Sequence, residues 1–307
     1  MGNLALRQDG LSKEEGRKLW QWRQEALKSA RAADVPIEEV DWLCREVAGL
    51  DSLALRLESY KGQQLNLRYP LTVLSQLWQR RLHDRLPVQY LVGVSHWRHF
   101  SLQVSPAVLI PRPETECLID LAIEAVKNCP TSHLDQGLWA DLGTGSGAIA
   151  FGLAEAFPFA KIHAVDYSNA ALSIAQQNAQ QLDLQDRIQF HQGSWWQPLA
   201  AFSGAFSGMV SNPPYIPSSL IPQLEPEVVN HEPLAALDGG SDGLDCIRQL
   251  IATSADYLQP GGVWLIEMMA GQADTVAGLL ESQGSYGNIQ VFSDLAGIDR
   301  FALAYRL

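Results

Sequence analysis

The sequence predicts an α/β protein built on a doubly wound, mostly parallel sheet of seven strands. From about residue 114 onward, short apolar runs alternate with longer segments whose apolar residues recur at helical spacing. A glycine-rich turn also follows the first of these runs, as in folds that bind ligands at the carboxyl ends of parallel strands. Strand–helix alternation favours parallel strands, because each helix carries the chain back to the start of the next strand.

The expected elements of this sheet follow in order along the chain. Helices are expected over residues 118–126, 148–157, 169–181, 244–258 and 273–282. Strands are expected over residues 138–142, 162–165, 188–191, 209–210, 263–267, 289–292 and 301–305. Ser168 is a suitable N-cap for the helix over 169–181, because its hydroxyl can accept a hydrogen bond from a free backbone N–H.

The chain before residue 106 has a different pattern. Three apolar stripes at helical spacing predict a small helical domain; they are Leu19, Trp22, Ala26 and Leu27, then Ile37, Val40, Leu43, Cys44 and Val47, then Leu71, Leu74, Leu77, Trp78 and Leu82. Residues 88–94 and 97–104 are rich in β-forming residues and predict a hairpin. We therefore expect a helical domain over 1–85, a β-hairpin linker over 86–105 and the α/β domain over 106–307.

Composition narrows the class of protein. The formal net charge of −12 argues against nucleic acid as the main ligand, since such proteins usually carry a basic stripe. Four separated cysteines without a CxxC pair favour a reducing cytoplasm over a disulfide framework. No run approaches the roughly 18 apolar residues of a membrane helix. His96 and His99 lack accompanying cysteines or carboxylates, so no metal site is expected.

The first motif that carries chemistry is the turn over residues 141–147, with the sequence DLGTGSG. Gly143, Gly145 and Gly147 allow the backbone to approach a ligand closely. Asp166 ends the next expected strand and can accept hydrogen bonds from both hydroxyls of an adenosine ribose. Taken together, the turn and Asp166 fit S-adenosylmethionine (SAM) and a nicotinamide dinucleotide equally well.

The second motif, Asn-Pro-Pro-Tyr over residues 212–215, separates these two possibilities. Its two prolines remove two backbone donors, which leaves carbonyl groups free to face a ligand. Asn212 adds a side-chain acceptor and Tyr215 adds an aromatic plane. Two acceptors beside a flat wall suit the planar NH2 group of an amide or a nucleobase. The motif therefore favours transfer of a methyl group from SAM to an amino or amide nitrogen.

Over nearly its whole length the chain resembles the PrmC/HemK family, the protein-(glutamine-N5) methyltransferases of peptide chain release factors. NPPY is shared with other amino-group methyltransferases. More specific are the segment over 100–116, which ends in IPRPETE, and the segment EPLAALDGGSDGL over 232–244. The resemblance implies the SAM-methyltransferase fold and methylation of the release-factor glutamine that follows two glycines.

The resemblance also implies residue roles. SAM is expected to contact Gly143, Thr144, Gly145, Ser146, Gly147, Asp166, Trp195 and Asn212. The substrate is expected to contact Asn212, Pro213, Pro214, Tyr215, Phe100 and Arg112. Asn212, Pro213 and Tyr215 are the expected catalytic residues: Asn212 Oδ1 and the Pro213 carbonyl accept the two amide hydrogens, and Tyr215 stacks on the amide. Two positions depart from the family pattern, namely Ser194, where an acidic residue is usual, and Met269, where a glycine is usual.

Several expectations concern partners. A release factor is the expected protein substrate, and the protein is expected to be a cytoplasmic monomer. The helical domain is expected to recognise the release factor, with Arg80, Arg81 and Arg85 as candidate contacts. Other functions share some of these motifs: methylation of a ribosomal-protein glutamine, methylation of a nucleic-acid base, a non-catalytic binding module and a nicotinamide-dependent oxidoreductase. The acidic net charge counts against the nucleic-acid substrate. The intact NPPY and glycine loop count against the binding module, and the oxidoreductase is disfavoured because no residue near NPPY is expected to handle a hydride.

Overall fold

The computed structural model describes residues 12–307, which fall into two compact units that meet in sequence at Gly93 and Val94. The expected linker hairpin thus belongs to the second unit. Among the described residues, no helix combines the length and apolar character needed to cross a bilayer.

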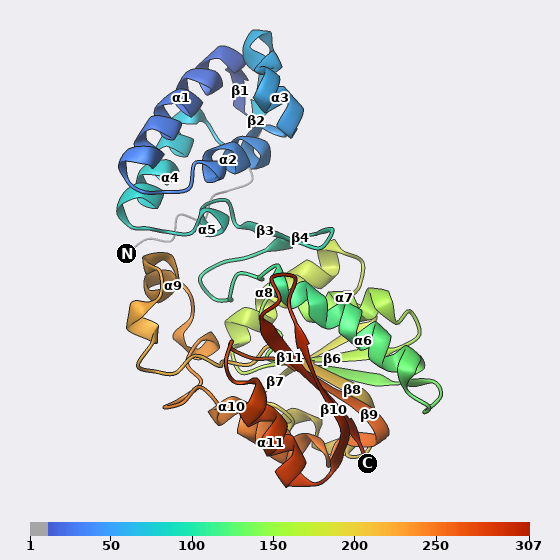
Figure 1. Cartoon of the computed structure of the whole chain (residues 1–307). Helices are drawn as coiled ribbons and strands as arrows, with labels where there is room; N and C mark the ends of the chain where they lie inside the picture. The colour runs from blue at the N-terminus through green and yellow to red at the C-terminus, as the bar shows by residue number, and fades with distance from the viewer. Residues whose placement is uncertain (1–11) are drawn as a thin grey trace. The chain divides into compact units, whose positions relative to one another are not determined.

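The first unit is mainly helical (Figure 1). Its elements are β1 (Ser12–Glu15), α1 (Gly16–Ala32), α2 (Glu38–Ala48), α3 (Ser52–Leu57), η1 (Ser59–Gly62), β2 (Gln64–Leu67), α4 (Leu71–His83) and α5 (Val88–Val92). The three predicted apolar stripes lie on α1, α2 and α4, except that Ile37 is the N-cap of α2, and most of their members are buried. Trp22 and Trp78 meet edge to face, with ring centroids 6.4 Å apart, as part of this core. The antiparallel pair β1–β2 was not predicted.

The expected strand over residues 88–94 is wrong. Pro87 precedes a helical turn, α5, which ends at Gly93 with a φ of 73°. Val88, Leu91 and Val92 are buried, and their spacing is that of one helical face. The hairpin instead pairs β3 (Val94–Trp97) with β4 (Phe100–Gln103). The β-branched residues of this segment misled the prediction, because burial of one helical face overrides their modest helix penalty.

The second unit contains the predicted seven-stranded sheet. Its strands are β5 (Leu138–Leu142), β6 (Lys161–Asp166), β7 (Ile188–Gln192), β8 (Phe206–Ser211), β9 (Leu258–Glu267), β10 (Tyr286–Ser293) and β11 (Asp299–Arg306). The strand order is β10-β11-β9-β8-β5-β6-β7. The pairs from β9 to β7 are parallel, whereas β11 runs antiparallel to both β9 and β10. The prediction of a mostly parallel, doubly wound sheet is confirmed.

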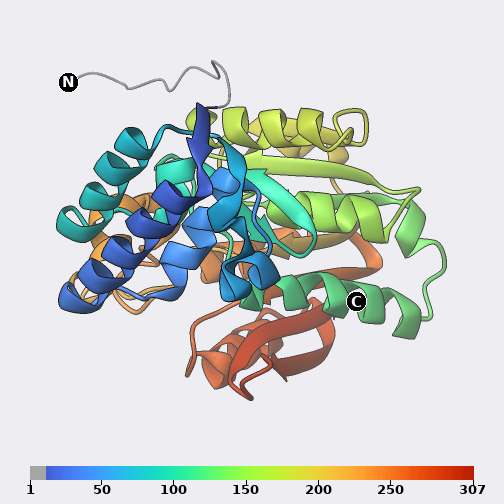
Figure 2. The same cartoon turned by 90° about the horizontal axis from the view of Figure 1, so that it is seen from above.

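Helices cover both faces of the sheet (Figures 1 and 2). One apolar cluster joins the sheet to α6 (Cys117–Asn128), α7 (Ala148–Ala156) and α8 (Asn169–Gln181). A second cluster, on the other face, joins it to α10 (Asp245–Ser254) and α11 (Ala273–Gln283). Neighbouring strand residues divide between the clusters, since Val210 belongs to the first and Met209 to the second.

The remaining elements are short. They are η2 (Glu114–Glu116), η3 (Leu134–Gln136), η4 (Gln197–Phe202), η5 (Ile221–Gln223), α9 (Pro226–His231) and η6 (Leu234–Ala236). Ser168 caps α8 as predicted, because its hydroxyl accepts a hydrogen bond from the Ala171 N–H at 3.2 Å. The chain turns back beside β5 to form β8, so the strand order reverses between these two strands. Ligands of open α/β sheets bind at such a reversal, outside the carboxyl ends of the strands.

Candidate active site

A cavity of about 280 Å³ opens at this edge of the sheet. Segments that follow β5, β6, β7 and β8 all contribute to its wall. The lining residues that the argument below uses are Gly143, Gly145, Asp166, Ser194, Trp195, Asn212, Pro214, Pro233, Ala235 and Ala236. The structure thus brings together most of the residues expected at the cofactor site and two from NPPY.

The glycine loop, residues 141–147, needs glycine for conformational reasons. Gly145 has a φ of 54°, and a Cβ atom there would have no atom within 4 Å. Gly147 has a φ of 92°, and a Cβ atom there would lie 2.4 Å from the Phe151 ring. The first residue leaves room where a ligand can approach the backbone, and the second allows α7 to pack closely on the loop.

Thr144 and Ser146 support this loop from behind. Both side chains are buried, and neither residue lines the cavity. The Thr144 hydroxyl donates to Asp141 Oδ2 at 2.6 Å. Asp141 is fully buried, its Oδ1 has no hydrogen-bond partner, and burial raises its pKa to about 7. Thr144 therefore serves the shape of the loop more directly than it serves a ligand.

Asp166 stands at the end of β6 and faces the cavity. Its Oδ2 accepts from the Gly145 N–H and its Oδ1 from the Ser168 N–H, both at 2.8 Å. Burial raises the pKa of Asp166, and these two donated hydrogen bonds oppose that rise. A carboxylate has about four lone-pair positions, so both oxygens keep capacity for ribose hydroxyls.

Trp195 supplies the flat wall of the cavity. Its φ of 50° lies in the left-handed region, which is costly for a bulky residue. The indole lies beside Gly143, within ordinary contact distance of a Cβ atom placed there. Ser194, the first departure from the family pattern, also lines the cavity, so a hydroxyl stands where an acidic side chain is usual.

The NPPY loop, residues 212–215, begins where β8 ends. Ser211 anchors it, since its hydroxyl donates to the Leu142 carbonyl at 2.5 Å. Asn212 Nδ2 donates to Thr115 Oγ1 at 3.2 Å, and the Tyr215 hydroxyl donates to Glu267 Oε1 at 2.9 Å. Burial raises the pKa of Tyr215 and keeps it protonated. Asn212 and Pro214 line the cavity, whereas the Tyr215 hydroxyl points to Glu267.

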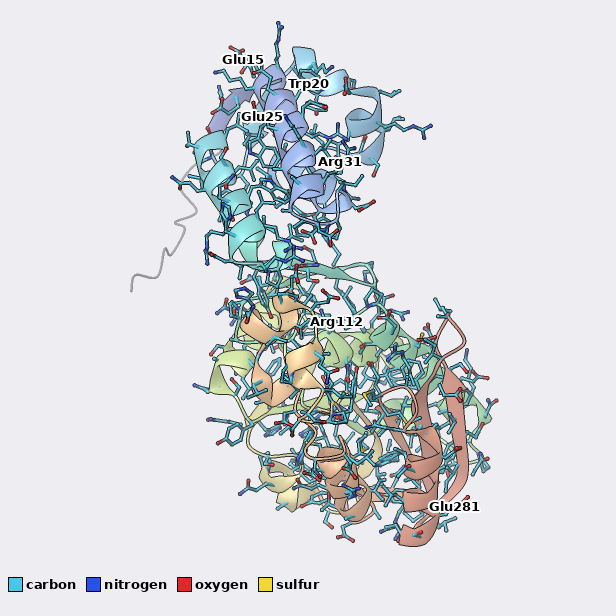
Figure 3. The ribbon with its side chains drawn as sticks, turned by 60° about the vertical axis from the view of Figure 1, so that its left-hand side comes forward. Glu15, Trp20, Glu25, Arg31, Arg112 and Glu281 are labelled. Carbon is cyan, nitrogen blue, oxygen red and sulfur yellow. The ribbon has the colours of Figure 1, made fainter. Side chains whose placement is uncertain are left out.

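The cover segment, residues 216–237, completes the cavity through Pro233, Ala235 and Ala236. An ion pair holds it: Arg112 Nη2 donates to both oxygens of Glu232, at 2.8 and 2.7 Å. Glu232 is buried, and Arg112, labelled in Figure 3, lies beside the segment that carries α9. Arg112, expected to contact the substrate, is thus committed at least in part to this pair.

Phe100 does not lie at the cavity. Its side chain is 5% exposed and packs edge to face on Phe151 in the first apolar cluster. This placement argues against the expected contact with substrate. Phe100 begins β4, and its burial anchors the hairpin to α7. Pro213 is also buried within the NPPY loop, so its backbone carbonyl is the group available for the expected role.

Several supporting residues were not predicted. Asn178 is fully buried and donates from Nδ2 to the carbonyls of Ser146 and Gln103 while its Oδ1 accepts from the Gln103 N–H. Gln272 Nε2 donates to the Tyr215 carbonyl at 3.1 Å. Thr115 and Glu267 stand in segments that carried sequence signals, namely IPRPETE and the end of a strand. No signal marked Asn178, whose position on a helix face is ordinary. Within residues 12–307, no group of three or more potential metal ligands occurs.

Comparisons with known proteins agree with this geometry. Residues 139–282 match a family model described as a methyltransferase domain. The release factor glutamine methyltransferase of Synechocystis sp. is 49% identical over 95% of this chain and 97% of that protein. The protein of that name from Gloeobacter violaceus is 46% identical over 92% of this chain and 96% of its own length.

The fold also matches a solved structure, the catalytic domain of hMettl16 in complex with an RNA hairpin. That structure has a TM-score of 0.55 and 15% identity, and the match covers 86% of this chain and 88% of that one. This likeness concerns the fold alone. Identity near one half over nearly the full length, together with the intact glycine and NPPY loops, shows that the chain belongs to the release factor glutamine methyltransferase family.

Proposed function

We propose that this protein transfers the methyl group of SAM to the side-chain amide nitrogen, N5, of a glutamine in peptide chain release factors. The observation that carries the proposal is the position of Asn212, which lines the same cavity as Gly145, Asp166 and Trp195. An amide that reaches Asn212 is therefore next to the place where the cofactor residues converge. The names of the full-length relatives support the choice of substrate.

The residues of the cavity fit SAM. Gly145 offers open space against its backbone, Asp166 offers carboxylate oxygens to a ribose, and Trp195 offers a flat apolar wall to an adenine. Bound SAM supplies an electrophilic methyl group on a sulfonium centre. The binding residues we propose are Gly143, Gly145, Asp166, Trp195 and Asn212, with Thr144, Ser146 and Gly147 shaping the loop.

The proposed mechanism rests on placement of the glutamine amide. Asn212 Oδ1 and the Pro213 carbonyl each accept one amide hydrogen, which aims the nitrogen lone pair and stabilises the positive charge that develops on nitrogen. Orientation of this kind can lower a barrier by roughly 7–11 kcal/mol. No general base is assigned, since a protonated amide loses its proton readily. We do not assign that role to Tyr215 either, because its hydroxyl donates to Glu267 and burial raises its pKa.

A competition between acceptors tests the proposed substrate. The purified protein is incubated with radiolabelled SAM and with a release factor, a mixture of ribosomal proteins, or DNA. Label should enter the release factor, and peptide mass spectrometry should place the methyl group on one glutamine. A release factor with that glutamine replaced by glutamate is the matched control and should stay unlabelled. Label only in ribosomal protein or DNA would refute the proposal.

We further propose that the first unit recognises the release factor. A glutamine side chain is small, so contacts remote from the NPPY loop must distinguish one protein from another. Two of the expected contact residues are poor candidates. Arg81 is 2% exposed and donates to Glu39 at 2.5 and 2.8 Å, and Arg85 donates to the Ala33 carbonyl at 3.2 Å. Arg80, whose side chain is 57% exposed, remains a candidate.

A truncated protein that begins at Val94 tests this role, because the second unit starts there. It should bind SAM with unchanged affinity and methylate intact release factor with a strongly raised KM. Full kcat/KM in the folded truncated protein would refute the recognition role. We propose that the protein acts as a monomer. We also propose that it acts in the cytoplasm, because its proposed substrates work at the ribosome.

A further inference from the structure

Two buried side chains from distant segments contact the first and last residues of the NPPY loop, Asn212 and Tyr215. Thr115, in η2, is 5% exposed, and Glu267, at the end of β9, is 2% exposed. The Thr115 hydroxyl donates to Glu267 Oε2 at 2.6 Å. Glu267 Oε1 accepts from the Tyr215 hydroxyl, and Thr115 Oγ1 accepts from Asn212 Nδ2. One carboxylate thereby holds both ends of the loop.

The direction of these hydrogen bonds follows from the chemistry of the groups. In the structure the hydroxyls of Thr115 and Tyr215 both donate to Glu267. This arrangement suits an ionised carboxylate, which only accepts hydrogen bonds. Burial raises the pKa of Glu267, while the two hydroxyl donors and the positive charge of Arg300 lower it. With its only hydrogen committed to Glu267, Thr115 can offer Asn212 nothing but a lone pair.

This restriction fixes the orientation of the Asn212 amide. A side-chain amide can rotate by half a turn and exchange its oxygen and nitrogen at little cost in shape. Because Thr115 accepts and cannot donate, only the Nδ2 group of Asn212 is satisfied on that side. The oxygen, Oδ1, is then held on the other side of the amide, where it can accept a hydrogen from a substrate NH2 group. The reversed amide would turn its oxygen toward the Thr115 lone pair and its NH2 group toward the substrate NH2 group, and neither contact would be a hydrogen bond.

The backbone of the loop is held as well. Gln272 Nε2 donates to the carbonyls of Tyr215 and Gly243, at 3.1 and 3.3 Å, and Gln272 Oε1 accepts from the Met269 N–H at 2.9 Å. Met269, the second departure from the family pattern, thus contributes its backbone and not its side chain. These three hydrogen bonds involve neither Thr115 nor Glu267, so a change in the orientation of the Asn212 amide can be separated from collapse of the loop.

We propose that Thr115 and Glu267 are positioning residues for methyl transfer, which set the polarity of the Asn212 amide through a relay of oriented hydrogen bonds. This inference rests on the proposed function, because it assigns Asn212 Oδ1 to the substrate amide. Neither residue lines the cavity, so neither is expected to contact SAM.

The first test compares two substitutions of Thr115 in the full-length protein, with a release factor as substrate. Thr115→Val keeps the shape and removes the hydroxyl, whereas Thr115→Ser keeps the hydroxyl. For Thr115→Val, kcat at saturating substrate should fall roughly 10- to 100-fold, the scale of a small misplacement of reacting groups, with the Kd for SAM unchanged. Thr115→Ser should retain kcat within about threefold. Equal losses for both variants, or wild-type kcat for Thr115→Val, would overturn the proposal.

The second variant, Glu267→Gln, reverses the relay without changing its shape. Its amide can donate to Thr115, which frees the threonine hydroxyl to donate to Asn212 and turns the amide around. We expect a fall in kcat similar to that of Thr115→Val, again with unchanged SAM affinity and a melting temperature close to wild type. A purely structural role would lower the melting temperature and leave kcat intact below it, and that result would refute the relay.

A measurement without substrate keeps this inference separate from the proposed function. The Asn212 side-chain NH2 signals in a 1H–15N spectrum are assigned by their loss in Asn212→Ala. They should shift in Thr115→Val and return close to wild type in Thr115→Ser. If the wild-type protein does not methylate release factors but these shifts occur, the proposed function fails and the relay stands. If the shifts are absent, the relay is wrong whatever the substrate.

Discussion

Replacement of Arg112 by alanine should weaken the binding of SAM by loosening the cover segment. In the wild-type protein the guanidinium donates to both oxygens of Glu232, whose side chain is 1% exposed. Removing one partner of a buried ion pair costs about 3–5 kcal/mol, because the remaining charge is left without water. The Arg112 side chain is 34% exposed, so water screens part of the interaction and we expect about 2–3 kcal/mol.

That loss of free energy should destabilise the cover segment and not the core of the protein. Glu232 precedes Pro233, Ala235 and Ala236, which line the cavity, and the helices of this segment are at most six residues long. Such segments open without unfolding the core. The Kd for SAM rises by the reciprocal of the closed fraction, so a loss of 2–3 kcal/mol sets an upper limit of about 30- to 160-fold.

Isothermal titration with SAM measures the effect for wild type, Arg112→Ala, Glu232→Gln and the double variant. Because Glu232→Gln removes the unpaired charge, the double variant should bind SAM more tightly than Arg112→Ala alone. The reasoning is refuted if Arg112→Ala leaves the Kd for SAM unchanged and raises only the KM for release factor. Arg112 would then act through the substrate, as the family resemblance implies.

Three further predictions concern the cavity itself. Asn212→Ala should lower kcat by about 10²–10³, the usual cost of one lost transition-state contact, while the Kd for SAM stays within a few-fold; near wild-type kcat in a single-turnover assay would contradict its role. Asp166→Ala should instead raise the Kd for SAM by about 10- to 100-fold, as expected for hydrogen bonds to a charged group, and unchanged affinity by titration would show that the adenosine lies elsewhere. Asp141→Asn should alter the pH dependence of stability. Burial raises the pKa of Asp141 from 3.8 to about 7, so between these values the folded protein keeps a proton that the unfolded chain has released. The stability that Asp141 contributes is therefore full below about pH 4 and falls as pH rises to about 7, by up to about 1.4 kcal/mol per pH unit. Denaturant unfolding at pH 5 and pH 7 without SAM should show a difference between wild type and Asp141→Asn that shrinks toward the higher pH; a constant difference would rule out this titration.

Periodic apolar residues predicted the elements best, because burial of one face imposes a regular apolar spacing along the whole helix or strand. The stripe Leu74, Leu77 and Trp78 lies on α4 as expected. The prediction failed at Val88–Val92, where five residues are too few for periodicity to outweigh β-rich composition. The pair β1–β2 escaped prediction because only one of its two strands buries alternate residues fully.

The residues of the candidate site likewise fall into those that the sequence predicted and those that it did not. Residues in contiguous motifs, such as Gly145, Asp166 and Asn212, were predicted because a turn or strand end fixes their position locally, and the structure places them on one cavity. The partners of these residues were not predicted. Glu267 lies 52 residues from Tyr215 and 152 from Thr115. Only the folded sheet brings such groups within hydrogen-bond distance, and no spacing in the sequence encodes that meeting.

Asn178 has a consequence for how the cofactor site responds to its ligand. Its single amide ties the Ser146 carbonyl of the glycine loop to both backbone groups of Gln103 at the end of the hairpin. Opening of the loop removes one of the three hydrogen bonds that orient the Asn178 amide. We therefore expect occupancy of the cavity to slow hydrogen exchange at Gln103, although that residue does not line it. The hydrogen-exchange rate at Gln103, at the end of the hairpin, should thus report whether the glycine loop is closed.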